Sequence, residues 1–188
     1  MPANEHLTMQ IAQQVYGIET AANALMYFGN GEPAYLTKRF DVLPDGTKLA
    51  QEDFAALAAK SPQTHGTNYK YQGSYLDLFL LMRQFIPSYR VESLKLFKLL
   101  VFNFLFSNGD AHLKNFSLIT KNGKTTLTPI YDFLNSSIAI KNPEEEIALT
   151  LNGKKSNLKA SDFVDYYAKE RLQLNEKTIT TILEQMHN

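Results

Sequence analysis

Asp110 and Asn115 stand five positions apart in a polar segment that also contains His112 and Lys114. A carboxylate followed five residues later by an asparagine suits phosphoryl transfer. In catalytic loops of that class, the aspartate accepts the proton of the substrate hydroxyl and the asparagine binds Mg²⁺. An Asn-Gly-Asp turn followed by a lysine is also ordinary loop chemistry, so the spacing by itself leaves both interpretations open.

A second carboxylate, Asp132, ends a predicted strand and is followed by Phe133, an order typical of a metal-binding aspartate. Residues 116–120 and 125–130 flank Asn-Gly, the strongest short hairpin signal. The hairpin would begin just after Asn115 and end just before Asp132. Strand pairing would therefore make these two side chains neighbours, which favours a Mg²⁺ site with oxygen ligands.

The elements that position this segment are predicted from hydrophobic periodicity. Residues 74–86 form a helix ended by Pro87, and residues 89–107 form a second helix with little polar surface, which we expect to be the buried centre. This central helix delivers the polar segment from its carboxyl end. The break is expected at Asn108-Gly109, because both residues tolerate a positive φ.

Towards the amino end, Asn4 is expected to cap a helix that buries Leu7, Ile11 and Val15 and stops at Gly17. Glu5, in the first turn of this helix, either interacts favourably with the helix dipole or pairs with a phosphate-binding lysine.

The remaining chain yields shorter elements. Residues 24–28 and 34–40 are predicted to form a hairpin, and residues 52–60 a short helix. Residues 61–73 are the best candidate for a mobile loop. A short strand or extended piece over 147–151 and helices over 162–171 and 176–186 complete the expected elements.

Composition bounds the class of protein. The chain has 188 residues, of which 44% are hydrophobic and 20% charged, as in an ordinary globular domain or two small lobes. Nineteen basic and nineteen acidic residues give a formal net charge of zero, which argues against a chain-wide nucleic-acid-binding field. Without cysteine there are no disulfides or thiolate metal sites, which is compatible with the cytoplasm we expect. No signal peptide or membrane span is predicted.

Residues 108–117, followed by Leu127-Thr128-Pro129-Ile130-Tyr131-Asp132, closely resemble the core of the HipA-like serine/threonine kinases, the toxin halves of bacterial toxin–antitoxin pairs. The likeness covers most of the chain. Residues 4–9 are similar to the first helix of this region of the family, residues 35–41 to its hinge strand, and residues 51–54 and 147–155 to later segments. The resemblance implies an α+β, mostly helical fold. It would be a protein-kinase-like C-lobe over about 46–188 with a small N-lobe remnant and hinge over about 1–45.

The resemblance also assigns roles. Asp110 would be the catalytic base or would orient the substrate hydroxyl. Asn115 and Asp132 would hold Mg²⁺ against the phosphates of ATP. Lys114 would meet the charge that develops on the transferred phosphoryl group, and His112 would be an orienting or structural residue.

The hinge would border the adenine through Lys38, Arg39 and Phe40. Lys38 stands where family members often carry an acidic residue. Because hinges contact adenine mainly through the backbone, this departure weakens the match only a little. Phe40 either packs near the base or is simply a strand residue that faces the core.

One departure from the family is large: no glycine-rich phosphate loop and no phosphate-gripping lysine precede Asn4. We therefore expect a fragment, one half of a split kinase completed by a separate N-terminal subdomain, or a decayed relative that binds without catalysis. The hypotheses are a kinase core that is weak by itself and a pseudokinase that docks a DNA-binding antitoxin. The resemblance implies a protein substrate, with a translation factor or an aminoacyl-tRNA synthetase among the options, and no direct contact with nucleic acid or membrane.

Overall fold

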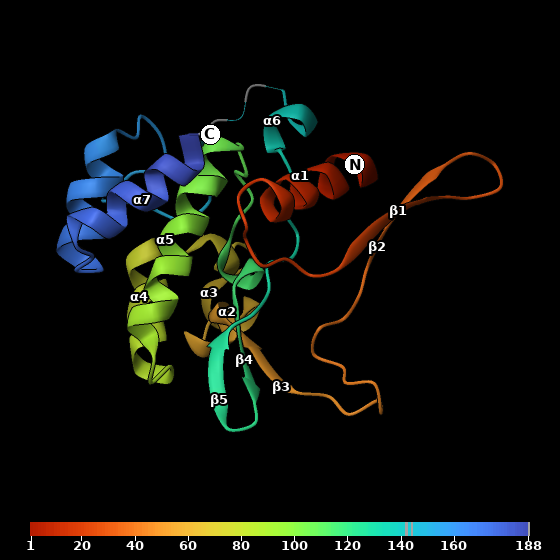
Figure 1. The fold of residues 1–188 in the computed structure, drawn as a ribbon, viewed down its shortest axis with the longest axis horizontal. Helices are drawn as coiled ribbons and strands as arrows, with labels where there is room; N and C mark the ends of the chain where they lie inside the picture. The colour runs from red at the N-terminus through yellow and green to blue at the C-terminus, as the bar shows by residue number, and fades with distance from the viewer. Residues whose placement is uncertain (142, 144, 188) are drawn as a thin grey trace.

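The computed structural model describes residues 1–141, 143 and 145–187. A helical body carries a three-stranded sheet on one side, and a two-stranded hairpin projects from it (Figure 1). The predicted α+β, mostly helical class is confirmed. Among the described residues, no helix is long and apolar enough to cross a bilayer.

The centre of the body is the pair of helices α4 (Tyr75–Phe85) and α5 (Tyr89–Leu105). Both were predicted from their periodicity. Ser74 caps α4 through a reciprocal capping box with Asp77, which satisfies two backbone donors that the first turn leaves open. Nine residues of α5 are buried, as expected for a helix that is apolar on most of its faces.

The sheet has the order β3-β4-β5, antiparallel throughout. The predicted hairpin is present as β4 (Ser117–Lys121) and β5 (Lys124–Leu127), turning through Asn122 and Gly123 at φ +51° and +73°. The helix predicted over 52–60 is shorter than expected and is present only as α2 (Phe54–Leu57). Residues 52 and 53 belong instead to the third strand of the sheet, β3 (Ala50–Asp53).

The amino-terminal region differs from expectation in detail. Helix α1 (Pro2–Gln14) begins before Asn4, which lies inside it and bonds through its side chain to the backbone of Asn135. Leu7 and Val15 are exposed, and the buried face is instead Thr8, Met9 and Ala12. The expected hairpin forms from β1 (Asn23–Tyr27) and β2 (Pro33–Thr37).

The segment expected to be a mobile loop contains two short helices, α3 (Pro62–His65) and the 3₁₀ turn η1 (Tyr69–Tyr71). Residues 147–151, expected to be a short strand or an extended piece, form no regular strand in the described structure. They make isolated bridges at Thr150 and Leu151, and most of them are buried.

The carboxyl-terminal part of the described chain contributes a short helix and two longer ones. Helix α6 (Ser136–Ala139) follows the site segment. The helix expected over 162–171 is present as the π-helix η3 (Asp162–Arg171), and the last expected helix is α7 (Glu176–His187), which Asn175 caps through its side chain.

Candidate active site

The polar segment leaves α5 close to the predicted break but turns at a different residue. The helix ends at Leu105, and the left-handed residue is Ser107 (φ +51°) rather than Asn108 or Gly109. Asn108 is buried, and its side-chain amide donates to Asn103 Oδ1 over 2.8 Å, which ties the turn to the last turns of the helix. The loop is therefore anchored in the core immediately before Asp110.

Asn115 and Asp132 are in contact. Asn115 Nδ2 donates to Asp132 Oδ2 over 2.5 Å, and its Oδ1 accepts the backbone N–H of His112 over 3.0 Å. Asn115 ends the 3₁₀ turn η2 (Leu113–Asn115), and only Phe116 separates it from β4. Asp132 follows β5 in the left-handed conformation (φ +61°) that a short polar side chain tolerates. The β4–β5 hairpin thus brings these two side chains together, as its topology predicts.

The donor atoms of this pair fit Mg²⁺. Asn115 Oδ1 keeps a second lone pair, and in the described structure no side chain or backbone donor contacts Asp132 Oδ1. Mg²⁺ is usually bound through one or two such oxygens together with substrate phosphates. Within the described ranges, no group of three or more His, Cys, Asp or Glu side chains could hold a metal by itself. The pair therefore fits an ion that arrives with phosphate.

Asp110 receives a hydrogen bond that the sequence does not predict. The phenol of Tyr71 donates to Asp110 Oδ1 over 2.7 Å. Burial and this bond raise the pKa of Tyr71 to about 12, so the phenol remains a donor. Tyr71 lies 39 residues earlier, in the segment expected to be mobile. The only local signal is a pair of tyrosines in an otherwise polar stretch.

His112 is a packed side chain. It is buried, and its ring meets the Tyr71 ring edge-on with centroids 5.1 Å apart. Burial, and then the nearby charge of Lys70, lower the pKa of His112, so the imidazole is neutral at neutral pH. Within the described structure its Nδ1 has no hydrogen-bond partner.

Lys114 contacts a carboxylate that the sequence analysis did not identify. Its Nζ lies 3.0 Å from Asp53 Oδ2, and this hydrogen bond raises the pKa of the Lys114 ammonium. Asp53 is the last residue of β3, and its Oδ1 also accepts the N–H of Ala56 to cap α2. Pairing of β3 with β4 places Asp53 beside the polar segment.

The hinge residues occupy different environments. Lys38 is exposed, and its backbone N–H donates to Ala22 over 2.8 Å. Arg39 makes a two-pronged ion pair with the buried Asp41. Phe40 is half-buried, with its ring centroid 5.8 Å from that of Tyr131, next to Asp132. It packs against the core but lies three residues beyond the end of β2, so it is not the strand residue of the second interpretation, and its position near the base stays a prediction.

A polar cavity of about 260 Å³ connects the hinge to the polar segment. Its lining includes Arg39, Lys48, Asp53, Lys114 and Tyr131. Three of the predicted site regions, the hinge, the loop after α5 and the segment before Asp132, therefore share one cavity.

Glu5 faces the same region from α1. Burial, and then the negative charge of Asp132, raise the pKa of the Glu5 carboxyl from 4.5 to about 7. Two carboxyl groups close enough to repel one another would be stabilised by a cation between or beside them. The Glu5 carboxyl is therefore close enough to Asp132 for the two negative charges to repel, and its pairing with a lysine stays a prediction.

The model of the HipA-like C-terminal domain matches residues 1–188. The chain belongs to this family. Among curated relatives, "Putative kinase Y4mE" of Sinorhizobium fredii is 29% identical over 192 residues, covering 96% of this chain and 44% of its own length. A "Putative kinase" of Haemophilus influenzae is 30% identical over 142 residues, covering 71% of this chain and 41% of its own.

Solved structures show the same fold. The toxin HipA of Shewanella oneidensis, solved with HipB and operator DNA, superposes with a TM-score of 0.78 at 22% identity, covering 99% of this chain and 46% of that one. The Helicobacter pylori proinflammatory kinase CtkA gives a TM-score of 0.63 at 14% identity, covering 97% of this chain and 74% of that one. The fold is therefore kinase-like, as predicted. The chain spans less than half the length of the curated HipA-like relatives that it matches.

Proposed function

We propose that this chain is the core of an ATP- and Mg²⁺-dependent protein serine/threonine kinase of the HipA type. The observation that carries the proposal is the contact between Asn115 and Asp132, in the same loop system as Asp110. Oxygen ligands next to a hydrogen-bonded carboxylate are what phosphoryl transfer needs, because its catalysis consists mostly of positioning and charge stabilisation.

In the proposed site, Asn115 and Asp132 hold Mg²⁺, which neutralises phosphate charge when it is bound with ATP. Asp110 accepts the proton of the substrate hydroxyl, and Tyr71 holds the Asp110 carboxylate in place through its O–H. The polar cavity beside Arg39 and Tyr131 receives the nucleotide, with Phe40 at its edge. Lys114 would have to exchange Asp53 for phosphate to contribute charge.

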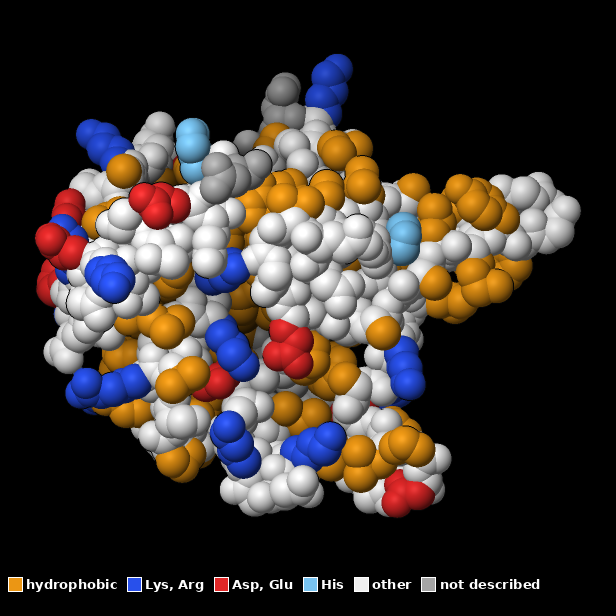
Figure 2. Space-filling model, viewed as in Figure 1, with side chains coloured by type: hydrophobic (Ala, Val, Ile, Leu, Met, Phe, Trp, Pro, Cys, Tyr) orange, Lys and Arg blue, Asp and Glu red, His pale blue; other side chains and the backbone are white. Residues whose placement is uncertain are grey.

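We propose the same lobe division as the sequence predicts, with an N-lobe remnant over about 1–45 and a C-lobe over about 46–188. The remnant contains the β1–β2 hairpin, which projects from the body with apolar side chains along it (Figure 2). Tyr27 and Phe28 at its tip are 65% and 62% exposed. A two-stranded hairpin is marginally stable alone. It fits a separate N-terminal kinase subdomain that adds strands, the phosphate loop and a lysine to meet Glu5.

The substrate would be a protein, with a translation factor or an aminoacyl-tRNA synthetase as the options that the resemblance implies. A DNA-binding antitoxin is the proposed partner, by analogy with the HipA–HipB–DNA complex of Shewanella oneidensis. We expect the kinase to act in the cytoplasm and not to contact nucleic acid itself.

The second candidate is a pseudokinase that binds nucleotide or antitoxin without efficient transfer. The observation in its favour is that the Lys114 ammonium is already neutralised by Asp53. Whether the chain is a kinase core or a pseudokinase, we expect it to transfer phosphate poorly when isolated. Robust phosphorylation by this chain, lost in Asp110→Ala, would contradict that expectation and remove the second candidate.

Calorimetric titration with ATP and Mg²⁺ tests the site directly. We expect saturable binding that requires Mg²⁺ and disappears in Asp132→Ala. The matched control is Asp165→Ala, which removes an exposed carboxylate that pairs only with Lys169 among the described residues. Binding that survives in Asp132→Ala would place the nucleotide elsewhere and would overturn the proposed metal site.

A further inference from the structure

The chain contains four arginines, and three of them line one small cavity. Arg83, Arg90 and Arg171 surround a space of about 100 Å³, whose other lining residues are Phe79, Tyr89, Leu172, Gln173 and Leu174. The fourth, Arg39, is held by Asp41 in the polar cavity near the hinge. Arginine is otherwise rare in this chain, which relies on lysine for its positive charge.

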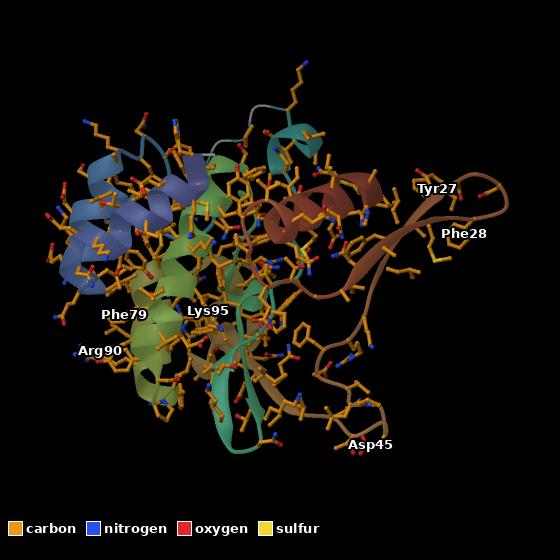
Figure 3. The ribbon with its side chains drawn as sticks, in the orientation of Figure 1. Tyr27, Phe28, Asp45, Phe79, Arg90 and Lys95 are labelled. Carbon is orange, nitrogen blue, oxygen red and sulfur yellow. The ribbon has the colours of Figure 1, made fainter. Side chains whose placement is uncertain are left out.

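Three elements contribute one arginine each. Arg83 lies in the last turn of α4, Arg90 in the first turn of α5, and Arg171 at the end of η3. Figure 3 shows Phe79 and Arg90 at the outer side of the α4–α5 pair, opposite the β1–β2 hairpin. The cavity shares no lining residue with the polar cavity of the candidate active site.

The charges in this cavity are poorly compensated. None of the lining side chains is a carboxylate, and within the described ranges Arg83 and Arg90 make no hydrogen bond or ion pair. Arg171 contacts the exposed Glu170 over 3.2 Å and lies over the ring of Tyr166, 4.8 Å from its centroid. Three guanidinium groups around one small space repel each other unless an anion enters.

The size and donor geometry select the anion. A guanidinium presents a planar fork of donors that matches an oxyanion such as phosphate with two parallel hydrogen bonds. Three such forks suit a compact group with several oxygens and two negative charges better than they suit a single carboxylate. The cavity is far smaller than the roughly 300–1,000 Å³ of sites for whole small molecules, so it fits one phosphate group rather than a nucleotide.

We propose that Arg83, Arg90 and Arg171 form a phosphate-binding site that is separate from the candidate active site. Its ligand is a phosphate group, either as free inorganic phosphate or as the monoester of a serine or threonine side chain. The inference does not rest on the proposed kinase function, because it uses none of the residues assigned to that function.

The small number of arginines makes the test selective. The full chain labelled with ¹⁵N-arginine gives four Nε–H resonances, which single Arg→Lys variants assign. We expect inorganic phosphate, and separately O-phosphoserine, to shift the three resonances of the cavity arginines at constant ionic strength. The Arg39 resonance distinguishes this site from the polar cavity, because the Arg39 Nε already donates to Asp41 over 2.9 Å there. A shift confined to Arg39 would place phosphate in the polar cavity and overturn the proposal.

Variants then test the geometry. Arg83→Gln and Arg90→Gln are each expected to weaken phosphate binding about tenfold or more, as for the loss of a hydrogen bond to a charged group. The corresponding Lys variants keep the charge but lose the fork, and should bind with intermediate affinity. Lys141→Gln removes one exposed charge elsewhere and should leave the affinity unchanged. Arg83 and Arg90 are exposed, so these substitutions are compatible with folding.

The outcomes separate the two sources of phosphate. Tighter binding of O-phosphoserine than of inorganic phosphate assigns the site to a phosphorylated side chain, and the reverse assigns it to the free ion. Shifts no larger than those produced by chloride, or equal weakening by Lys141→Gln, would overturn the proposal. Asp110→Ala should give the same three shifts, so a failure of the kinase function leaves this result intact.

Discussion

Asp53, the last residue of β3, contacts both helix α2 and Lys114, and its two carboxylate oxygens have separate roles. Oδ1 accepts the Ala56 N–H and caps α2, whereas Oδ2 contacts the Lys114 ammonium. Asn caps helices about as well as Asp, so Asp53→Asn should retain the cap and lose only the ion pair. Asp53→Ala loses both.

The magnitudes follow from exposure. The Lys114 side chain is 44% exposed and that of Asp53 23%, so the ion pair contributes only about 0.5 kcal/mol after screening by solvent. Loss of an N-cap costs about 1 kcal/mol. We therefore expect Asp53→Asn to lower the free energy of unfolding by about 0.5 kcal/mol and Asp53→Ala by about 1.5 kcal/mol.

Urea unfolding followed by circular dichroism measures these differences, and a double-mutant cycle of Asp53→Asn with Lys114→Met isolates the pair. Glu52→Gln is the matched control: it removes an exposed charge from the same strand and should change little. Equal losses in Asp53→Asn and Asp53→Ala would refute the cap. A coupling energy of zero would refute the contribution of the Lys114–Asp53 ion pair to stability.

Three further predictions concern the site and the core. Tyr71→Phe removes the O–H that holds Asp110, and should lower the rate of phosphoryl transfer by the completed kinase about tenfold without weakening ATP binding. Separate measurements of kcat and of the Kd for ATP check this, and an unchanged kcat would contradict it. Hydrogen bonds from Asn152 and Lys154 and from the Lys159 N–H lower the pKa of Asp162 to about 2, below its value near 4 in the unfolded chain. The ionised Asp162 therefore stabilises the fold above about pH 4, and this effect is lost as the pH falls towards 2. The difference in urea midpoint between the wild type and Asp162→Asn should shrink over that range. A difference that does not depend on pH would argue against the lowered pKa of Asp162. Phe54→Ala empties a fully buried position beside Phe116 and should cost about 3–5 kcal/mol by urea unfolding, whereas a loss below about 1 kcal/mol would mean that the region repacks.

The local sequence determined the parts of the site that depend on short-range chemistry. Asn122-Gly123 can adopt the two positive φ values of a tight hairpin, so the contact of Asn115 with Asp132 follows from residues within one supersecondary unit. The apolar run of α5 likewise predicts a buried helix that ends before Asp110.

Tertiary structure decided the contacts between distant segments. Ala50–Asp53 has the composition of a helix start, since Ala, Glu and Asp are disfavoured in strands, yet pairing with β4 makes it a strand and brings Asp53 to Lys114. Tyr71 reaches Asp110 only because η1 packs against η2. On α1, Leu7 and Val15 have the right spacing for a buried face, but the helix is oriented by what Met9 and Ala12 can bury. Each of these outcomes depends on the free energy of long-range packing, which no local pattern contains.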